Sequence, residues 1–261
     1  MQQTGGLVLL SHDDYATLDE DDFGVPGLVA SEIVGPFVRL QALGPLIMVH
    51  DGVFEPHHGI GHHPHRANER LFYILDGAVD HDDALNGIVG RMEKGDLGRL
   101  TEGLRGMLHK EWNNTDGRAR AFILVYSTNT EPPPARASFA ALRDADAPRY
   151  DEGPGARSKE LVGPKANFPV NGDIRLFTDT RIERGRELSV GLGAEEGGLL
   201  FTVDGAVEVE GAAGAGGSEL GRDETVLLPP AAEARSVRVR SAEGARVIRV
   251  VFGPGYGLVV G

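Results

Sequence analysis

The sequence predicts an all-β protein made of two similar domains in tandem. Short apolar runs recur along the chain, separated by turn residues at intervals of roughly ten residues, and no long stretch has helical periodicity. Glycine accounts for 37 of the 261 residues, about twice its ordinary share of ~7%, which indicates many tight turns. One ten-residue pattern also occurs twice. Together these observations favour two consecutive β-sandwiches or barrels.

Individual strands follow from the same apolar runs. Residues 236–240 alternate between polar and apolar side chains, which is the pattern of a strand with one face in solvent. The strands predicted in this way cover residues 46–50, 71–75, 120–126, 225–228, 236–240 and 246–252.

The middle of the chain predicts a domain boundary. Residues 131–165 are rich in proline, glycine and charge, which is typical of a linker, with one helical turn expected at 138–143. We therefore expect an N-terminal domain over residues 1–130 and a C-terminal domain over residues 166–261.

The two halves contain related segments. Residues 71–80 read LFYILDGAVD and residues 199–208 read LLFTVDGAVE, a separation of 128 residues. This repeat predicts a duplicated domain, and the apolar run that ends in Asp-Gly predicts a β-hairpin in each copy. The Gly-Ala run at 211–218 is expected to form a flexible hairpin loop in the second copy.

Charge and composition exclude several classes of function. The net charge of −13 disfavours direct binding to nucleic acid or to anionic lipid. The absence of cysteine excludes disulfides, thiolate zinc sites and thiol catalysis. The sequence contains no P-loop, dinucleotide-binding fingerprint or serine-hydrolase elbow. It also shows no secretory leader or membrane span, so we expect a cytoplasmic protein.

Histidines are confined to the first half of the chain, where all nine lie at or before position 109. His63 and His65 stand two residues apart, and so do His109 and Glu111, so each pair shares one face of its strand. If the two strands are neighbours, three imidazoles and one carboxylate converge. Such a set suits Fe(II), Mn, Ni, Cu or Zn, whereas Mg and Ca prefer oxygen ligands.

Two alternatives remain open from the residues alone. Glu69 has the same strand parity as His63 and His65, so it competes with Glu111 as the carboxylate ligand. Three other histidines lie in a segment rich in glycine and proline, and are expected to be solvated loop residues: His57, His58 and His62.

The second half of the chain provides an internal comparison. A shift of 128 residues carries His63, His65 and Glu69 to glycines at 191, 193 and 197, and nothing replaces His109. We therefore expect a metal site in the first domain and a scaffold role for the second.

At this point the chain resembles a known family. Residues 63–113 are similar to the core of the pirins, a family of bicupins, and the two-domain layout fits over the whole length. The resemblance rests on two motifs at matching spacing: His63-Pro64-His65-Arg66 with Glu69, and Gly95-Asp96, Thr101, Gly103, Gly106, His109 and Glu111. The run His81-Asp82-Asp83 also fits.

The resemblance implies two double-stranded β-helix (cupin) domains, with metal only in the first. By motif position the ligands would be His63, His65, His109 and Glu111, while Glu69 would support the site from outside. The chain departs from the family at three places beside these positions, which are expected to line the pocket: Ala67-Asn68 for Gly-Phe, Glu102 for a small residue, and Trp112-Asn113 for Met-Pro.

The resemblance also implies candidate functions. The first is a dioxygenase that uses one divalent metal, Fe(II) by preference, and O₂ to cleave a flavonol such as quercetin, with Glu111 as the catalytic base and carbon monoxide as a product. The second is a non-enzymatic metal- or redox-sensing regulator that binds a protein partner. A third is a cupin isomerase, or a dioxygenase acting on a different aromatic diol.

Overall fold

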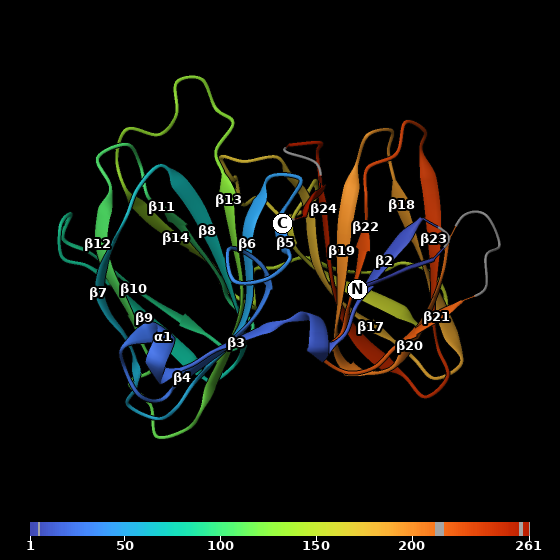
Figure 1. The fold of residues 1–261 in the computed structure, drawn as a ribbon, viewed down its shortest axis with the longest axis horizontal. Coiled ribbons are helices and arrows are strands. Elements are labelled where there is room, and N and C mark those ends of the chain that lie inside the picture. The colour runs from blue at the N-terminus through green and yellow to red at the C-terminus, as the bar shows by residue number, and fades with distance from the viewer. Residues whose placement is uncertain (5, 212–216, 256–257, 261) are drawn as a thin grey trace.

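The computed structural model describes residues 1–4, 6–211, 217–255 and 258–260. It has two lobes side by side, and each lobe contains two facing antiparallel β-sheets (Figure 1). The predicted all-β bicupin fold is confirmed. Within the described residues, helix is limited to two short turns, η1 (His12–Asp14) and α1 (Glu20–Phe23). Among the described residues, no helix has both the length and the apolar character that crossing a bilayer demands.

The first lobe consists of a large and a small sheet. The first large sheet has the strand order β14 (Ser138–Leu142), β11 (Leu97–Thr101), β8 (Asn68–Asp76), β13 (Ala119–Ser127), β6 (Leu46–Phe54), β4 (Leu28–Val34) and β3 (Ala16–Leu18), with β5 (Leu40–Leu43) also paired to β6. The first small sheet has the order β10 (Ile88–Glu93), β9 (Ala78–Asp83), β12 (Met107–Trp112) and β7 (Gly59–His65).

The second lobe has the same construction. The second large sheet has the order β1 (Gln2–Thr4), β2 (Leu7–Leu10), β22 (Thr225–Leu228), β19 (Gly197–Gly205), β24 (Ala245–Phe252), β17 (Ile174–Ile182), β16 (Ala156–Val162) and β15 (Arg149–Asp151). The second small sheet has the order β18 (Arg186–Leu192), β23 (Arg235–Ser241), β20 (Val207–Glu210) and β21 (Ser218–Leu220).

The strand orders of the two lobes correspond, as the predicted duplication requires. The series β11-β8-β13-β6-β4 matches β22-β19-β24-β17-β16, and β10-β9-β12-β7 matches β21-β20-β23-β18. In the second lobe β20 and β21 form the expected hairpin, with Val209 opposite Ser218. Of the loop predicted between them, residues 212–216 lie outside the described residues.

The repeated Asp-Gly pairs do not close hairpins, so that prediction is wrong. β8 belongs to the large sheet and β9 to the small one, and Gly77 makes the corner between them. Gly77 has φ +68° and Gly205 has φ +76°, both in the left-handed region. A side chain would also collide with a neighbouring backbone, because a Cβ would lie 2.5 Å from the Arg118 carbonyl at Gly77 and 2.3 Å from the Gly244 carbonyl at Gly205.

The expected domain boundaries differ from the strand pairing in three places. β2, near the N-terminus, pairs with β22 of the second lobe. β25 (Leu258–Val260), near the C-terminus, pairs with β5 of the first. The predicted linker 131–165 contains three strands, of which β14 pairs with β11 while β15 and β16 extend the second large sheet. The helical turn expected at 138–143 is the strand β14.

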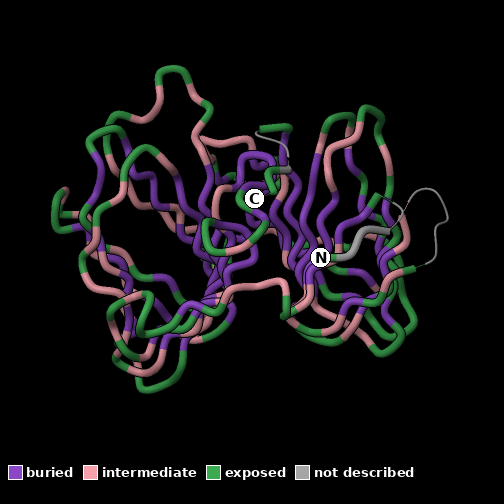
Figure 2. Tube along the Cα trace, viewed as in Figure 1, coloured by how far each residue is buried: buried purple, intermediate pink, exposed green. Residues whose placement is uncertain are grey.

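The large sheets pack against each other and bury a core between the lobes. We call this cluster the shared core, and its largest members are Tyr73, Phe122, Tyr126, Phe177, Phe201 and Phe252. Figure 2 shows buried chain running through the junction. The continuous apolar sequence of β13 is explained by burial on both of its faces. Phe122 and Leu124 face the shared core, whereas Ala121 and Ile123 face the interior of the first lobe. The first large sheet is therefore covered on both faces.

Candidate metal centre

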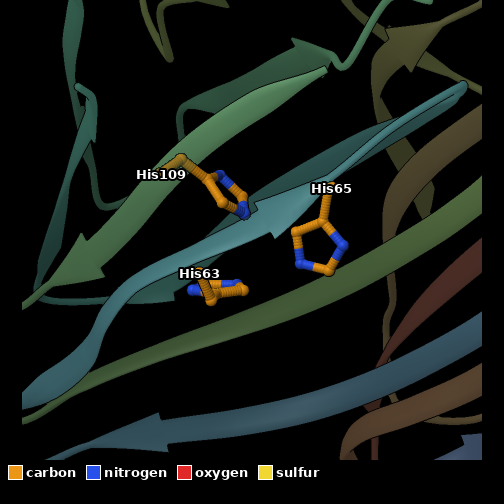
Figure 3. Close-up of side chains that lie close together, drawn as sticks. All are labelled: His63, His65 and His109. Atoms are coloured by element: carbon orange, nitrogen blue, oxygen red, sulfur yellow. The ribbon is translucent and has the colours of Figure 1, made fainter. Parts of the chain in front are cut away.

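Three histidines meet on the inner face of the first small sheet. β7 and β12 are antiparallel neighbours, and His109 lies directly opposite His63. Their ring centroids are 4.5 Å apart, and His65 lies 4.7 Å from His63 and 5.0 Å from His109. One nitrogen from each ring lies within 4.8 Å of the others. Figure 3 shows the three rings gathered in one place, two from β7 and one from β12.

Glu111 lies beside these histidines on β12. The pairing of β12 with β7 is irregular between His109 and Glu111, and the carboxylate remains on the same side as the rings. Its Oε2 is 3.9 Å from Nε2 of His63, and its Oε1 is 2.8 Å from Nδ1 of His109. Only 3% of the Glu111 side chain is exposed. The structure thus brings together the four side chains that the sequence singled out.

His81 is a fifth member of the cluster that the sequence analysis did not identify as a ligand. It lies on β9 directly opposite Glu111, and forms a metal-compatible group with His109 and Glu111. Its ring stacks on Phe139 at 5.5 Å with an angle of 12° between the planes. The sequence does place a carboxylate, Asp83, two residues from His81, but Asp83 accepts hydrogen bonds from the Asn86 side chain and the Leu108 backbone.

Several buried polar atoms in this cluster have no hydrogen-bond partner. Among the described residues these include both ring nitrogens of His81 and His109, and Oε1 of Glu111. The 2.8 Å approach of His109 to Glu111 is close, but its geometry does not satisfy a hydrogen bond. Buried polar groups normally have partners. A divalent cation would satisfy these nitrogen and oxygen lone pairs together, so the residues present fit a metal ion.

Burial holds the imidazoles of His63, His65 and His81 in the neutral form that a metal ligand needs. Burial lowers the pKa of His65 to about 3, with Arg70 adding to the effect, and burial lowers the pKa of His81 to about 4. Burial also lowers the pKa of His63. Nδ1 of His63 donates to the Gly61 carbonyl at 2.8 Å, which leaves Nε2 with its lone pair free.

Glu111 is ionised in this setting. Burial on its own would raise the pKa of the carboxyl group, but His109 and then His63 outweigh burial and bring the pKa to about 2. The centre therefore presents one anionic oxygen beside the neutral nitrogens of His63, His65 and His81, a set that borderline divalent transition metals prefer.

Glu69, the competing carboxylate, points away from the histidines. It is fully buried on β8 in the large sheet. Its oxygens accept hydrogen bonds from Thr101 (2.5 Å), from Tyr126 (2.6 Å), and from both the backbone and the side chain of Asn171 (2.7 and 2.5 Å). Two of these four hydrogen bonds come from Asn171 of the second lobe, and the other two come from side chains of the first. Its role is to link the lobes.

The remaining histidines of this region lie outside the cluster. His57 is exposed and contacts Asp116, and His58 bonds to the Pro56 carbonyl. His62 is also exposed, but it lies within β7 and on the opposite face from His63, near Asp82. It is therefore a strand residue and not the loop residue that we expected.

The positions that depart from the family pattern have separate structural roles. Glu102 is fully buried and accepts from Nε of Arg70 at 2.8 Å and from the Asn68 backbone at 2.9 Å. Asn113 is also fully buried, and its amide donates to three backbone carbonyls of the adjoining loops. Both residues brace the strand ends, which corrects the expectation that they line the pocket.

Ala67 departs from the family glycine at a position that favours glycine. It has φ +75° and is exposed. We expect Ala67→Gly to stabilise the protein by about 1 kcal/mol, because an L side chain is strained in the left-handed region. Urea unfolding measures the change. Ala84→Gly is the matched control, since this exposed alanine has negative φ and should lose stability. A loss of stability in Ala67→Gly would contradict the assigned strain.

The second lobe has apolar side chains where the first has this cluster. Val190 lies opposite Val237 as His63 lies opposite His109, and Val209 lies opposite Val239 as His81 lies opposite Glu111. All four valines are buried. The sequence shift of 128 therefore misplaces β7 by one residue, because it pairs His63 with the outward-facing Gly191 and not with Val190.

Comparisons with known proteins agree with this architecture. A family model described as Pirin matches residues 24–124. A pirin-like protein of Caulobacter vibrioides is 30% identical over 177 residues, which cover 64% of this chain and 70% of that protein. The crystal structure of the bacterial pirin YhhW from Escherichia coli, in complex with nickel(II), has a TM-score of 0.76 at 16% identity and covers 95% of this chain and 99% of that one.

A further solved structure of the same fold is a quercetin 2,3-dioxygenase from Acinetobacter baumannii. Its TM-score is 0.77 at 18% identity, covering 97% of this chain and 88% of that one. Fold and site together define a bicupin with a candidate metal centre in its first lobe. The chain belongs to the pirin family.

Proposed function

We propose that the protein is a metal-dependent dioxygenase that cleaves a flavonol such as quercetin with O₂ and releases carbon monoxide. The observation that carries this proposal is the cluster of three imidazoles and one carboxylate on two adjacent strands. The side chain of His63 is 24% exposed, so the cluster is accessible from one side. The quercetin 2,3-dioxygenase that shares the fold supports the choice of substrate class.

His63, His65, His109 and Glu111 would hold the metal. Fe(II) is our first choice, and Mn, Ni, Cu and Zn are alternatives because the same ligand types accept all of them. When bound, the metal supplies a Lewis acid that favours the ionised form of a ring hydroxyl. His81, which is more deeply buried than His63 and His65, would pack behind His109 and Glu111 and fix their positions.

Glu111 would accept the proton of the flavonol hydroxyl. The carboxylate is ionised, and the oxygen that does not bind the metal would receive the proton. The enolate formed in this way is electron-rich and reacts with O₂. Both oxygen atoms of O₂ enter the ring-opened product, and one ring carbon leaves with its own oxygen as carbon monoxide. Nothing in the described residues favours the regulatory alternative over this reaction.

The variant Glu111→Gln tests the role of the base. The amide keeps an oxygen that can bind metal but is a very weak base, so we expect turnover of quercetin to fall at least about 100-fold while metal content stays close to that of the wild type. Absorbance of quercetin under air and elemental analysis measure the two quantities. Unchanged turnover would contradict the base role, and so would a loss of metal in proportion to the loss of activity.

A further inference from the structure

A positively charged cleft of about 550 Å³ lies between the lobes, on elements other than those that form the metal centre. The first lobe contributes Tyr73 and the turn before β11, and the second lobe contributes β15, β16, β17 and β24. Two carboxylates, those of Asp144 and Asp179, line it. Its six cationic side chains are Lys94, Arg149, Arg157, Lys159, Arg181 and Arg246. At the edge of the cleft Lys94 pairs with Asp76 and Arg157 approaches Asp151, so six cations against four anions leave two positive charges in excess, in a chain whose net charge is −13.

Three of the arginines form a row across adjacent strands. Arg157 lies directly opposite Arg181, and Arg181 lies directly opposite Arg246. Residues paired in this way project on the same face with Cβ atoms about 5 Å apart, and like charges at this separation destabilise the sheet. The fold alone therefore gives no reason to place these three residues together.

Each carboxylate of the cleft is already paired with one or more of the cleft's own cations. Arg246 binds Asp179 through Nε at 3.0 Å and through its terminal nitrogen at 2.7 Å, and Tyr73 donates to the same carboxylate. Asp144 lies 2.7 Å from Arg149 and 2.6 Å from Lys159. Neither acid is available to neutralise the centre of the arginine row.

The guanidinium groups of Arg157 and Arg181 consequently remain available to bind a ligand. The contact of Arg157 with Asp151 is 4.0 Å long, between two largely exposed side chains. Arg181 makes no ion pair or side-chain hydrogen bond with any residue that the structure describes. A guanidinium presents a planar fork of donors that matches the oxygens of phosphate and carboxylate.

The wall of the cleft beside these arginines is rigid. Lys159 is buried, donates to the Gly95 carbonyl at 3.0 Å and lies 4.8 Å above the ring of Tyr73. These contacts join the two lobes, so the positive charges are positioned before a ligand arrives. The volume is in the range of sites for small molecules.

We propose that this cleft binds a small oxyanion with at least two negative charges, namely a phosphate ester or diphosphate, or a polycarboxylate. Arg181 and Arg157 contact the anion. The negative charge of the rest of the molecule disfavours a nucleic acid, and the cations gather in one cleft and do not follow an extended stripe.

Calorimetric titration of the full chain with pyrophosphate, and separately with citrate, tests the proposal at low ionic strength. We expect one site per chain for at least one of them, and the more tightly bound anion identifies phosphate or carboxylate as the preferred chemistry. Arg181→Gln should weaken binding at least about 10-fold, the amount typical of one charge-assisted hydrogen bond.

Two control variants keep this result specific. Arg238→Gln removes the same charge from the second small sheet, outside the cleft, and should change affinity less than about twofold. His109→Ala should leave anion binding intact, because the cleft is separate from the metal centre. Binding of neither anion, equal losses in Arg181→Gln and Arg238→Gln, or loss of binding in His109→Ala would each overturn the proposal.

Thermal stability provides a second readout. Without anion, Arg181→Gln should melt at or above the temperature of the wild type, because the substitution relieves repulsion within the arginine row. The bound anion should raise the Tm of the wild type and of Arg238→Gln, and leave that of Arg181→Gln nearly unchanged. A lower Tm for Arg181→Gln without anion would show that Arg181 stabilises the sheet itself, and would overturn the proposal.

Discussion

Replacing His109 with alanine is expected to remove the metal. His109 is the one residue common to both groups of potential ligands, and it is fully buried between them. Its loss leaves two groups of two potential ligands each, joined through the 3.9 Å approach of His63 to Glu111. We expect metal affinity to fall at least about 100-fold, beyond the effect of removing a supporting residue, so that dialysed protein retains little of the roughly one ion per chain of the wild type.

His62→Ala is the matched control for this variant. His62 lies in β7 beside His63 but on the exposed face, so its removal deletes an imidazole from the same strand without touching the centre. Metal content measured by elemental analysis should match the wild type. Equal retention of metal by His109→Ala and His62→Ala would place the ion elsewhere and contradict the assignment.

Replacing Phe201 with alanine is expected to destabilise both lobes together. Phe201 belongs to the second lobe, and its ring lies 4.9 Å from that of Phe122 in the first, within the shared core. Truncation of a fully buried phenylalanine costs about 3–5 kcal/mol. Because the core is shared, the first lobe should lose stability as well.

Tryptophan fluorescence separates this expectation from local damage. The only tryptophan of the chain, Trp112, lies in the first lobe, whereas circular dichroism reports on both lobes. In urea, metal-free Phe201→Ala should shift both signals by the same amount. Phe37→Ala makes the same truncation at a residue that is 64% exposed, and should change stability by less than about 0.5 kcal/mol. An unmoved Trp112 transition would contradict a shared core.

The sequence allowed the strands and their inward faces to be predicted, but not all of their partners. Alternation and apolar runs depend on local burial, and the segments at 225–228 and 236–240 are strands as expected. The pairing of β2 with β22 and of β25 with β5 joins residues more than 200 positions apart. No local pattern encodes that choice, because an edge strand can extend either large sheet.

The part of the site that follows from strand parity could be predicted from the sequence. Parity put His63 with His65 and His109 with Glu111, and the pairing of β7 with β12 brings the two pairs together. Parity could not separate Glu111 from Glu69, because it indicates which face of a strand a residue occupies but not which sheet the strand joins. Glu69 lies on β8 of the large sheet and Glu111 on β12 of the small one. His81 could be recognised as a member of the cluster only from the register of β9 on β12. That register depends on the corner at Gly77 and not on spacing within one strand.

The central claim is that the histidine cluster of the first lobe holds a metal that supports cleavage of a flavonol. The most direct test follows the absorbance of quercetin under air with Fe(II)-loaded wild type and with the His109→Ala variant treated in the same way. We predict rapid loss of quercetin with the wild type and loss at the background rate with the variant. No loss with a wild type that holds one metal ion per chain, or equal loss with both proteins, would contradict the claim.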